Sequence, residues 1–67
     1  MTDEKFIIVV DDMRVSQVRW GAPGKPLAVE LSIFQARAFT EAQASSIKKY
    51  LSISPEYAQR RVLVVPQ

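Results

Sequence analysis

The 67-residue sequence contains no cysteine and no histidine. Without cysteine the chain has no disulfide and no thiol nucleophile, and without histidine its serines have no imidazole base. The two absences together also remove the usual protein ligands of zinc, copper and haem iron. The sequence therefore predicts a protein that is not an enzyme, with no catalytic residues, no metal and no cofactor.

Long apolar runs are also absent. The longest run is Phe6–Val10, whereas a helix that spans a bilayer needs about 20 apolar residues. Acidic residues precede this run and no cleavage site follows it, which is not the pattern of a secretory signal. We therefore expect a cytoplasmic protein that makes no contact with a membrane.

The composition is that of one folded domain, residues 1–67, with 48% apolar and 24% charged residues. A chain of this length buries only about 60% of the surface that it exposes when unfolded, so its stability is marginal. Size alone is therefore compatible with binding to a larger protein or with formation of a homodimer. The net charge of +2 is too small to indicate nucleic-acid binding by itself.

Four segments have the composition of strands. Lys5–Val10 and Arg61–Val65 are almost wholly apolar, which predicts two strands that are buried on both faces and paired at the centre of a sheet. Leu27–Leu31 alternates between apolar and other residues, which favours a strand, with a helix as the competing interpretation. The fourth segment is Arg14–Trp20.

The alternation within Arg14–Trp20 is irregular. Val18 and Trp20 share one face of a regular strand, while Val15 falls on the other. Either Val15 points outward, or an extra residue near Ser16 and Gln17 forms a β-bulge that restores the phase. The segment Gly21–Pro26 that follows has two glycines and two prolines, which indicates a hairpin loop.

Two capping boxes follow the third strand. Ser32 precedes Gln35 by three residues and Thr40 precedes Gln43 by three residues, a spacing typical of helix N-termini. We expect a short helix at about Ile33–Ala38 and a longer one at Glu41–Leu51. Lys48 and Lys49 would then occupy the last turn of the longer helix, where its dipole favours cations.

A third start signal precedes the last strand, since Ser54-Pro55-Glu56 predicts a single turn through about Arg60. The whole pattern predicts an α+β fold in β-β-β-α-α-β order. Its sheet would be mixed, mostly antiparallel, with the helices packed on one face.

Cations gather in the predicted hairpin together with the single tryptophan. Arginine and tryptophan are the residue types that dominate protein–protein contacts, so this hairpin is the predicted surface for a protein partner. The residues expected to bind the partner are Arg14, Gln17, Arg19, Trp20 and Lys25. Trp20 has a second interpretation as a core residue.

A nucleic-acid-binding protein is the alternative. The residues that would contact phosphates in that case are Lys48, Lys49, Arg60 and Arg61, together with the hairpin cations. The sequence offers few aromatic side chains between these cations, whereas sheets that bind single-stranded nucleic acids present several for base stacking.

The segment Ala36–Leu51 (ARAFTEAQASSIKKYL) resembles a pattern found in small phage and prophage accessory proteins. The matching residues are Ala36, Phe39, Thr40, Ala44 and Ile47. The resemblance covers about a quarter of the chain. It implies a phage-encoded inhibitor or modulator that binds a host complex, for example one of the defence or transcription machineries, and it supplies no functional residues.

Overall fold

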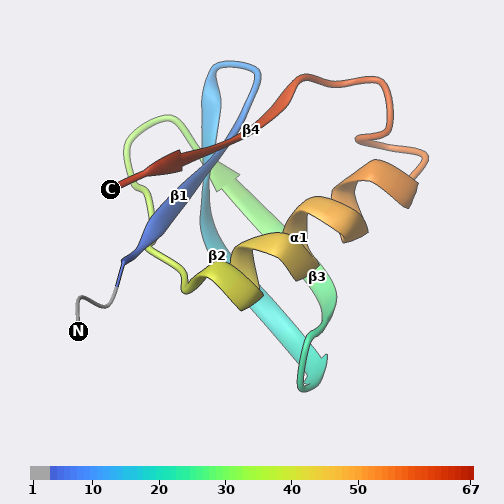
Figure 1. Cartoon of the computed structure of the whole chain (residues 1–67). Helices are drawn as coiled ribbons and strands as arrows, with labels where there is room; N and C mark the ends of the chain where they lie inside the picture. Colours follow the sequence, from blue (N-terminus) through green and yellow to red (C-terminus); the bar gives the residue numbers. More distant parts are fainter. Residues whose placement is uncertain (1–3) are drawn as a thin grey trace.

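The computed structural model describes residues 4–67, which form a four-stranded sheet with a helix against one face (Figure 1). The strands are β1 (Phe6–Val10), β2 (Met13–Ala22), β3 (Lys25–Ser32) and β4 (Val62–Pro66), and the helix α1 spans Glu41–Ile53. The order across the sheet is β3-β2-β1-β4, and all neighbours are antiparallel. The α+β class is confirmed. The predicted mixed sheet and the second helix are wrong, since the described elements follow the order β-β-β-α-β.

Residues 33–38, predicted as a helix, have no regular secondary structure. The capping chemistry itself is present, because the Oγ atom of Ser32 accepts hydrogen bonds from the backbone N–H groups of Phe34 at 3.0 Å and Gln35 at 3.1 Å. The turn that it stabilises does not continue, since so short a helix gains few internal hydrogen bonds to offset its nucleation.

Backbone pairing with two strands instead holds the end of this segment extended. The N–H of Arg37 donates to the carbonyl of Val15 at 3.1 Å. Phe39 exchanges two backbone hydrogen bonds of 2.8 Å with Phe6. Residues 37 and 39 therefore connect the backbones of β1 and β2, which pair directly with each other only near their shared turn.

The helix α1 begins as its sequence predicts. Thr40 is the N-cap, its side chain accepts from the N–H of Gln43, and the Gln43 side chain accepts from the N–H of Thr40. The helix ends two residues later than the predicted Leu51, so its last turn contains no cation and the expected placement of Lys48 and Lys49 there is wrong.

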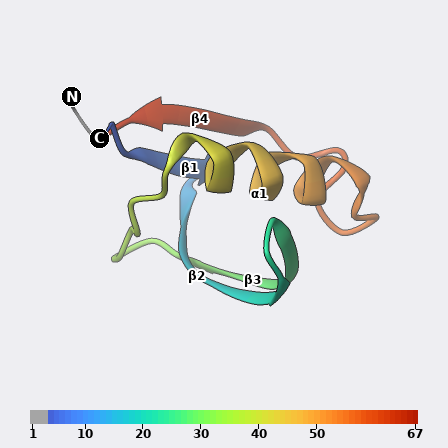
Figure 2. The ribbon, with the colours of Figure 1, turned by 60° about the horizontal axis from the view of Figure 1, so that its bottom comes forward.

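The core lies between α1 and the sheet. Ala44, Ile47 and Leu51 of the helix are buried against strand residues such as Ile8 and Val10. No described polar side-chain atom is buried without a hydrogen-bond partner. The one helix packs on one face of the sheet and leaves the opposite face without a covering helix or strand among residues 4–67, as Figure 2 shows.

The predicted pairing of the two apolar strands is correct, and β1 lies inside the sheet as expected, but the central position predicted for β4 is wrong. β1 and β4 pair over their whole length, yet β4 lies at the edge of the sheet. Their second apolar face is also not buried, and Leu63 is 48% exposed. Both faces of these strands are apolar, but α1 covers only one of them. A run of apolar residues looks the same in the sequence whether its second face is buried or open.

Candidate interaction surface

A β-bulge places the predicted arginines on one face of the sheet. The pairing of β2 with β3 shifts by one residue between Val15 and Gln17, so Ser16 has no direct partner. Both Val15 and Val18 are consequently buried in the core. The bulge restores the alternation of side chains between the two faces of β2. Arg14 and Arg19 therefore both point to the side opposite α1, which we call the outer face.

A row of four outer-face residues crosses the whole sheet. The register pairs Ser32 of β3 with Arg14 of β2, Arg14 with Val9 of β1, and Val9 with Leu63 of β4. Residues directly opposite in antiparallel strands share a face and have neighbouring side chains. Arg14 therefore sits beside an aliphatic surface, at the junction of the polar and apolar halves of the outer face.

The apolar half of the outer face is formed by β1 and β4. Ile7 pairs with Val65 and Val9 pairs with Leu63, so four aliphatic side chains form a two-by-two cluster. We call these four residues the aliphatic patch. Leu63 is exposed and the other three are half-buried. Sequence reasoning missed this surface, because it assigned these residues to the core.

The polar half of the outer face lies on β2 and β3. Arg19 pairs with Ala28 and Gln17 pairs with Glu30, and these four residues border an open hollow of about 610 Å³. Glu30 makes no ion pair with either arginine among residues 4–67. The guanidinium groups of Arg14 and Arg19 are thus exposed and available to a partner.

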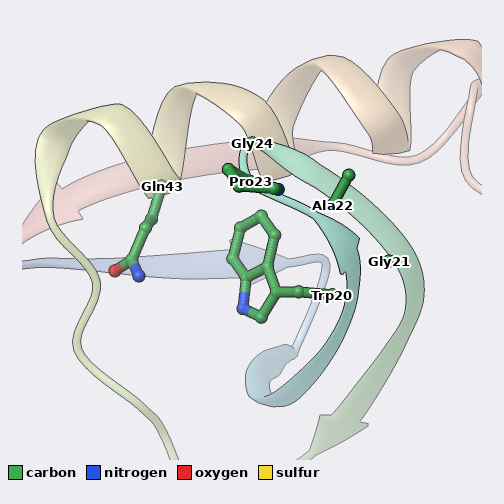
Figure 3. A pocket seen from close by; sticks show the side chains of 6 residues that line it. All are labelled: Trp20, Gly21, Ala22, Pro23, Gly24 and Gln43. Carbon is green, nitrogen blue, oxygen red and sulfur yellow. The ribbon is translucent and has the colours of Figure 1, made fainter.

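Trp20 lies on the other side of the sheet. Its side chain is half-buried against the core and borders an open hollow of about 490 Å³ between the hairpin tip and α1. Figure 3 shows the indole below α1, near Pro23 and Gln43. The Gln43 amide oxygen is already engaged in the capping box. Trp20 therefore packs toward the core, and it also borders the hollow that Gln17 and Arg19 line.

Lys25 is also separated from the outer-face arginines. It lines a hollow of about 390 Å³ at the hairpin tip, together with Ser46, Lys49 and Tyr50 of α1. The hydroxyl of Tyr50 donates to the carbonyl of Leu27 at 3.1 Å, which fixes the tip against the helix. The five predicted contact residues thus divide into an outer group, Arg14, Gln17 and Arg19, and a tip group, Trp20 and Lys25.

The cations of the nucleic-acid alternative are distributed differently. Lys48 and Lys49 are exposed on α1, while Arg60 and Arg61 lie in the connection to β4. Arg60 is engaged, since its Nη1 donates to Oδ2 of Asp11 at 3.0 Å. The neighbouring carboxylate therefore partly neutralises this set of cations.

Two further exposed apolar residues come directly after Ser32 in the sequence, and Ser32 is the β3 member of the outer-face row. Ile33 is 57% exposed and Phe34 is 87% exposed. A phenylalanine with so little burial adds nothing to the core, so it is a candidate contact residue beside the outer face. The sequence analysis expected a short helix at Ile33–Ala38 and did not single out Phe34 as a contact residue.

The residues of the phage-type pattern have structural roles here. Phe39, Ala44 and Ile47 are buried in the core and Thr40 caps α1, whereas Ala36 is exposed. Comparison with models of known protein families, with curated proteins and with solved structures finds no significant match to the chain.

The described part of the chain contains no group of three or more acidic residues placed to hold a metal ion. Its helix is too short and too polar to cross a lipid bilayer. The geometry that stands out in residues 4–67 is the uncovered outer face, with arginines beside aliphatic side chains.

Proposed function

We propose that this chain is a small non-enzymatic interaction protein of the cytoplasm that binds a larger protein or protein complex and modulates or inhibits it. The contact surface is the outer face, with the aliphatic patch at one side and Arg14, Gln17 and Arg19 at the other. The resemblance of Ala36–Leu51 to phage accessory proteins adds the further proposal that the partner is a host defence or transcription machinery.

The observation that carries this proposal is the row in which Arg14 lies between Ser32 and Val9, with Leu63 beyond. Arginine is, with tryptophan and tyrosine, enriched among the side chains that give large binding energies at desolvated interface centres. An arginine beside an aliphatic patch combines an apolar contact with a charged one, because its methylene stem packs on apolar surface while its guanidinium binds a carboxylate.

The charge of the surface specifies the chemistry of the partner. Within the described chain Arg14 and Arg19 form no ion pair, and Glu30 borders the same hollow as Arg19. A partner surface with one or two carboxylates around an apolar centre would complement this arrangement. Nucleic acid fits less well, because the open sheet presents aliphatic side chains where base stacking requires aromatic ones.

Two double variants with the same change in charge test the proposal. Arg14→Ala/Arg19→Ala removes two cations from the outer face, and Lys48→Ala/Lys49→Ala removes two from α1. The tagged wild type and both variants are incubated with host lysate, and the retained proteins are quantified by mass spectrometry. A specific partner should be retained by the wild type and the lysine variant and lost by the arginine variant.

Circular dichroism must first show that both variants are folded. Equal retention by both variants would contradict the proposed surface. Loss with the lysine variant alone, together with nucleic acid that dissociates between 50 and 200 mM salt, would favour the alternative function, since binding to phosphates weakens steeply with salt.

A further inference from the structure

The edge strand β4 has an unprotected outer side. It pairs with β1 on one side, and no other described segment bonds to it on the other. Native proteins usually shield such edges with a charged side chain, a bulge or a proline within the strand. Between Val62 and Val65 there is none of these, and Pro66 stands at the end of the strand.

The hydrogen-bond pattern identifies the free backbone groups. The N–H of Gln67 donates to Lys5 and the N–H of Asp11 donates to Arg61, both at 2.9 Å. Because alternate residues of an antiparallel strand bond to the same neighbour, the odd-numbered residues of β4 face β1. Val62 and Val64 therefore direct their N–H and C=O groups away from the sheet, and Pro66 directs its C=O group there.

We propose that β4 pairs with β4 of a second copy, antiparallel about a two-fold axis at Val64, to form one continuous eight-stranded sheet. In this register Val64 exchanges two hydrogen bonds with its own counterpart. The N–H of Val62 donates to the carbonyl of Pro66 in the other copy, so the missing N–H of Pro66 leaves one carbonyl per copy to water. The whole strand Val62–Pro66 overlaps with its counterpart.

The charges and apolar side chains near β4 are compatible with pairing to a second copy of the same strand. Arg61 would lie opposite Gln67, so no two cations meet across the axis. Arg14 and Arg19 lie on β2, two strands from the edge, and stay apart from their counterparts. The aliphatic patches of the two copies would adjoin and form a single apolar surface, because Leu63 and Val65 belong to the edge strand itself.

The register predicts which outer-face side chains meet. Leu63 of one copy lies opposite Val65 of the other, in a pair without mutual hydrogen bonds, where side chains approach most closely. Leu63→Lys/Val65→Lys therefore places two like-charged pairs across the axis, and Leu63→Lys/Val65→Glu places two opposite-charged pairs there. In both variants the same positions are polar on the outer face, so each is a matched control for the other.

Sedimentation equilibrium over a range of concentrations measures the association. The wild type should dimerise, the Lys/Lys variant should dimerise at least about tenfold more weakly, and the Lys/Glu variant should recover most of the difference. A monomeric wild type at millimolar concentration overturns the proposal. So does a Lys/Lys variant that associates like the wild type, or a Lys/Glu variant as weak as Lys/Lys.

Hydrogen exchange of the wild-type protein gives a second measurement, which does not depend on whether the variants fold. The amides of Val62 and Val64 should become protected as concentration rises, while those of Leu63 and Val65 are protected throughout by β1. Rapid exchange of Val62 and Val64 at concentrations where the protein is dimeric would place the contact elsewhere and overturn the proposal. The inference is independent of the partner proposed above.

Discussion

Asp11 ties the β1–β2 turn to the chain that enters β4. Its backbone has a φ of +53°, in the left-handed region that few residues other than glycine adopt easily. Its Oδ1 accepts from the N–H of Arg61 at 3.2 Å, and its Oδ2 accepts from Arg60 at 3.0 Å. Three separate contributions to stability thus meet in one residue, and substitutions can separate them.

Asp11→Ala removes all three contributions. The left-handed backbone costs alanine about 1 kcal/mol more than aspartate, the lost acceptor for Arg61 costs about 0.5–1 kcal/mol, and the exposed ion pair contributes about 0.5 kcal/mol. The sum is about 2 kcal/mol, which lowers Tm by about 8–16 °C in a domain of this size.

Asp11→Asn keeps the acceptor and the tolerance of the left-handed backbone, so we expect a loss of about 0.5 kcal/mol. Asp11→Gly relieves the backbone strain but loses both contacts, and should fall between the other two variants. Asp12→Ala is the control, because the side chain of Asp12 has no hydrogen bond or ion pair within residues 4–67.

Thermal unfolding followed by circular dichroism measures this series. The decisive comparison is between glycine and alanine, because alanine is ordinarily the more stabilising residue in regular structure. If Asp11→Ala proves as stable as Asp11→Gly, the strain argument is refuted. If Asp12→Ala destabilises as much as Asp11→Ala, the contacts with residues 60 and 61 have no special role.

Two further changes test the core and the bulge. Ile47→Ala, at a side chain with 0% exposure, should cost about 3 kcal/mol in urea denaturation, whereas Ile53→Ala, at a side chain that is 71% exposed, should be nearly neutral. Deletion of Ser16 should cost only about 1 kcal/mol, since it removes the hydrogen bond to the Glu30 carbonyl but leaves β2 in phase. Deletion of Arg19 should instead turn Trp20 outward, which would shift the tryptophan fluorescence to longer wavelength and lower Tm much more. Equal Tm values for the two deletion variants would contradict the register.

Local chemistry made much of this fold predictable. Hydroxyl and amide side chains at the right spacing identified the start of α1. The mismatch between Val15 and Val18 left two interpretations, an outward Val15 or a bulge, and the register shows the bulge. Strict alternation would place Arg14 and Arg19 on opposite faces, and the bulge places them on the same face. The sequence did not show that Trp20 and Lys25 also border hollows between the hairpin tip and α1.

Contacts between residues far apart in the sequence determine the features that the sequence analysis did not predict. The same Ser32 cap is compatible with a helix or with a single turn, and the pairing of Phe39 with Phe6 selected the extended chain. Likewise the apolar positions of β4 do not reveal whether a second layer covers them. The aliphatic patch was therefore invisible until the register placed Leu63 beside Val9 on an open face.

The most direct test of the proposed binding surface uses the protein retained from lysate by the wild type, once it is purified. Its affinity for Arg14→Ala/Arg19→Ala is compared with its affinity for Lys48→Ala/Lys49→Ala by isothermal titration calorimetry. Two arginines in the contact should each contribute about 1–2 kcal/mol, so the arginine variant is expected to bind about 30- to 1,000-fold more weakly than the wild type. The lysine variant should bind within about threefold of the wild type, since its changes lie away from the outer face. Equal affinities for the two variants would contradict the claim that the outer face is the binding surface.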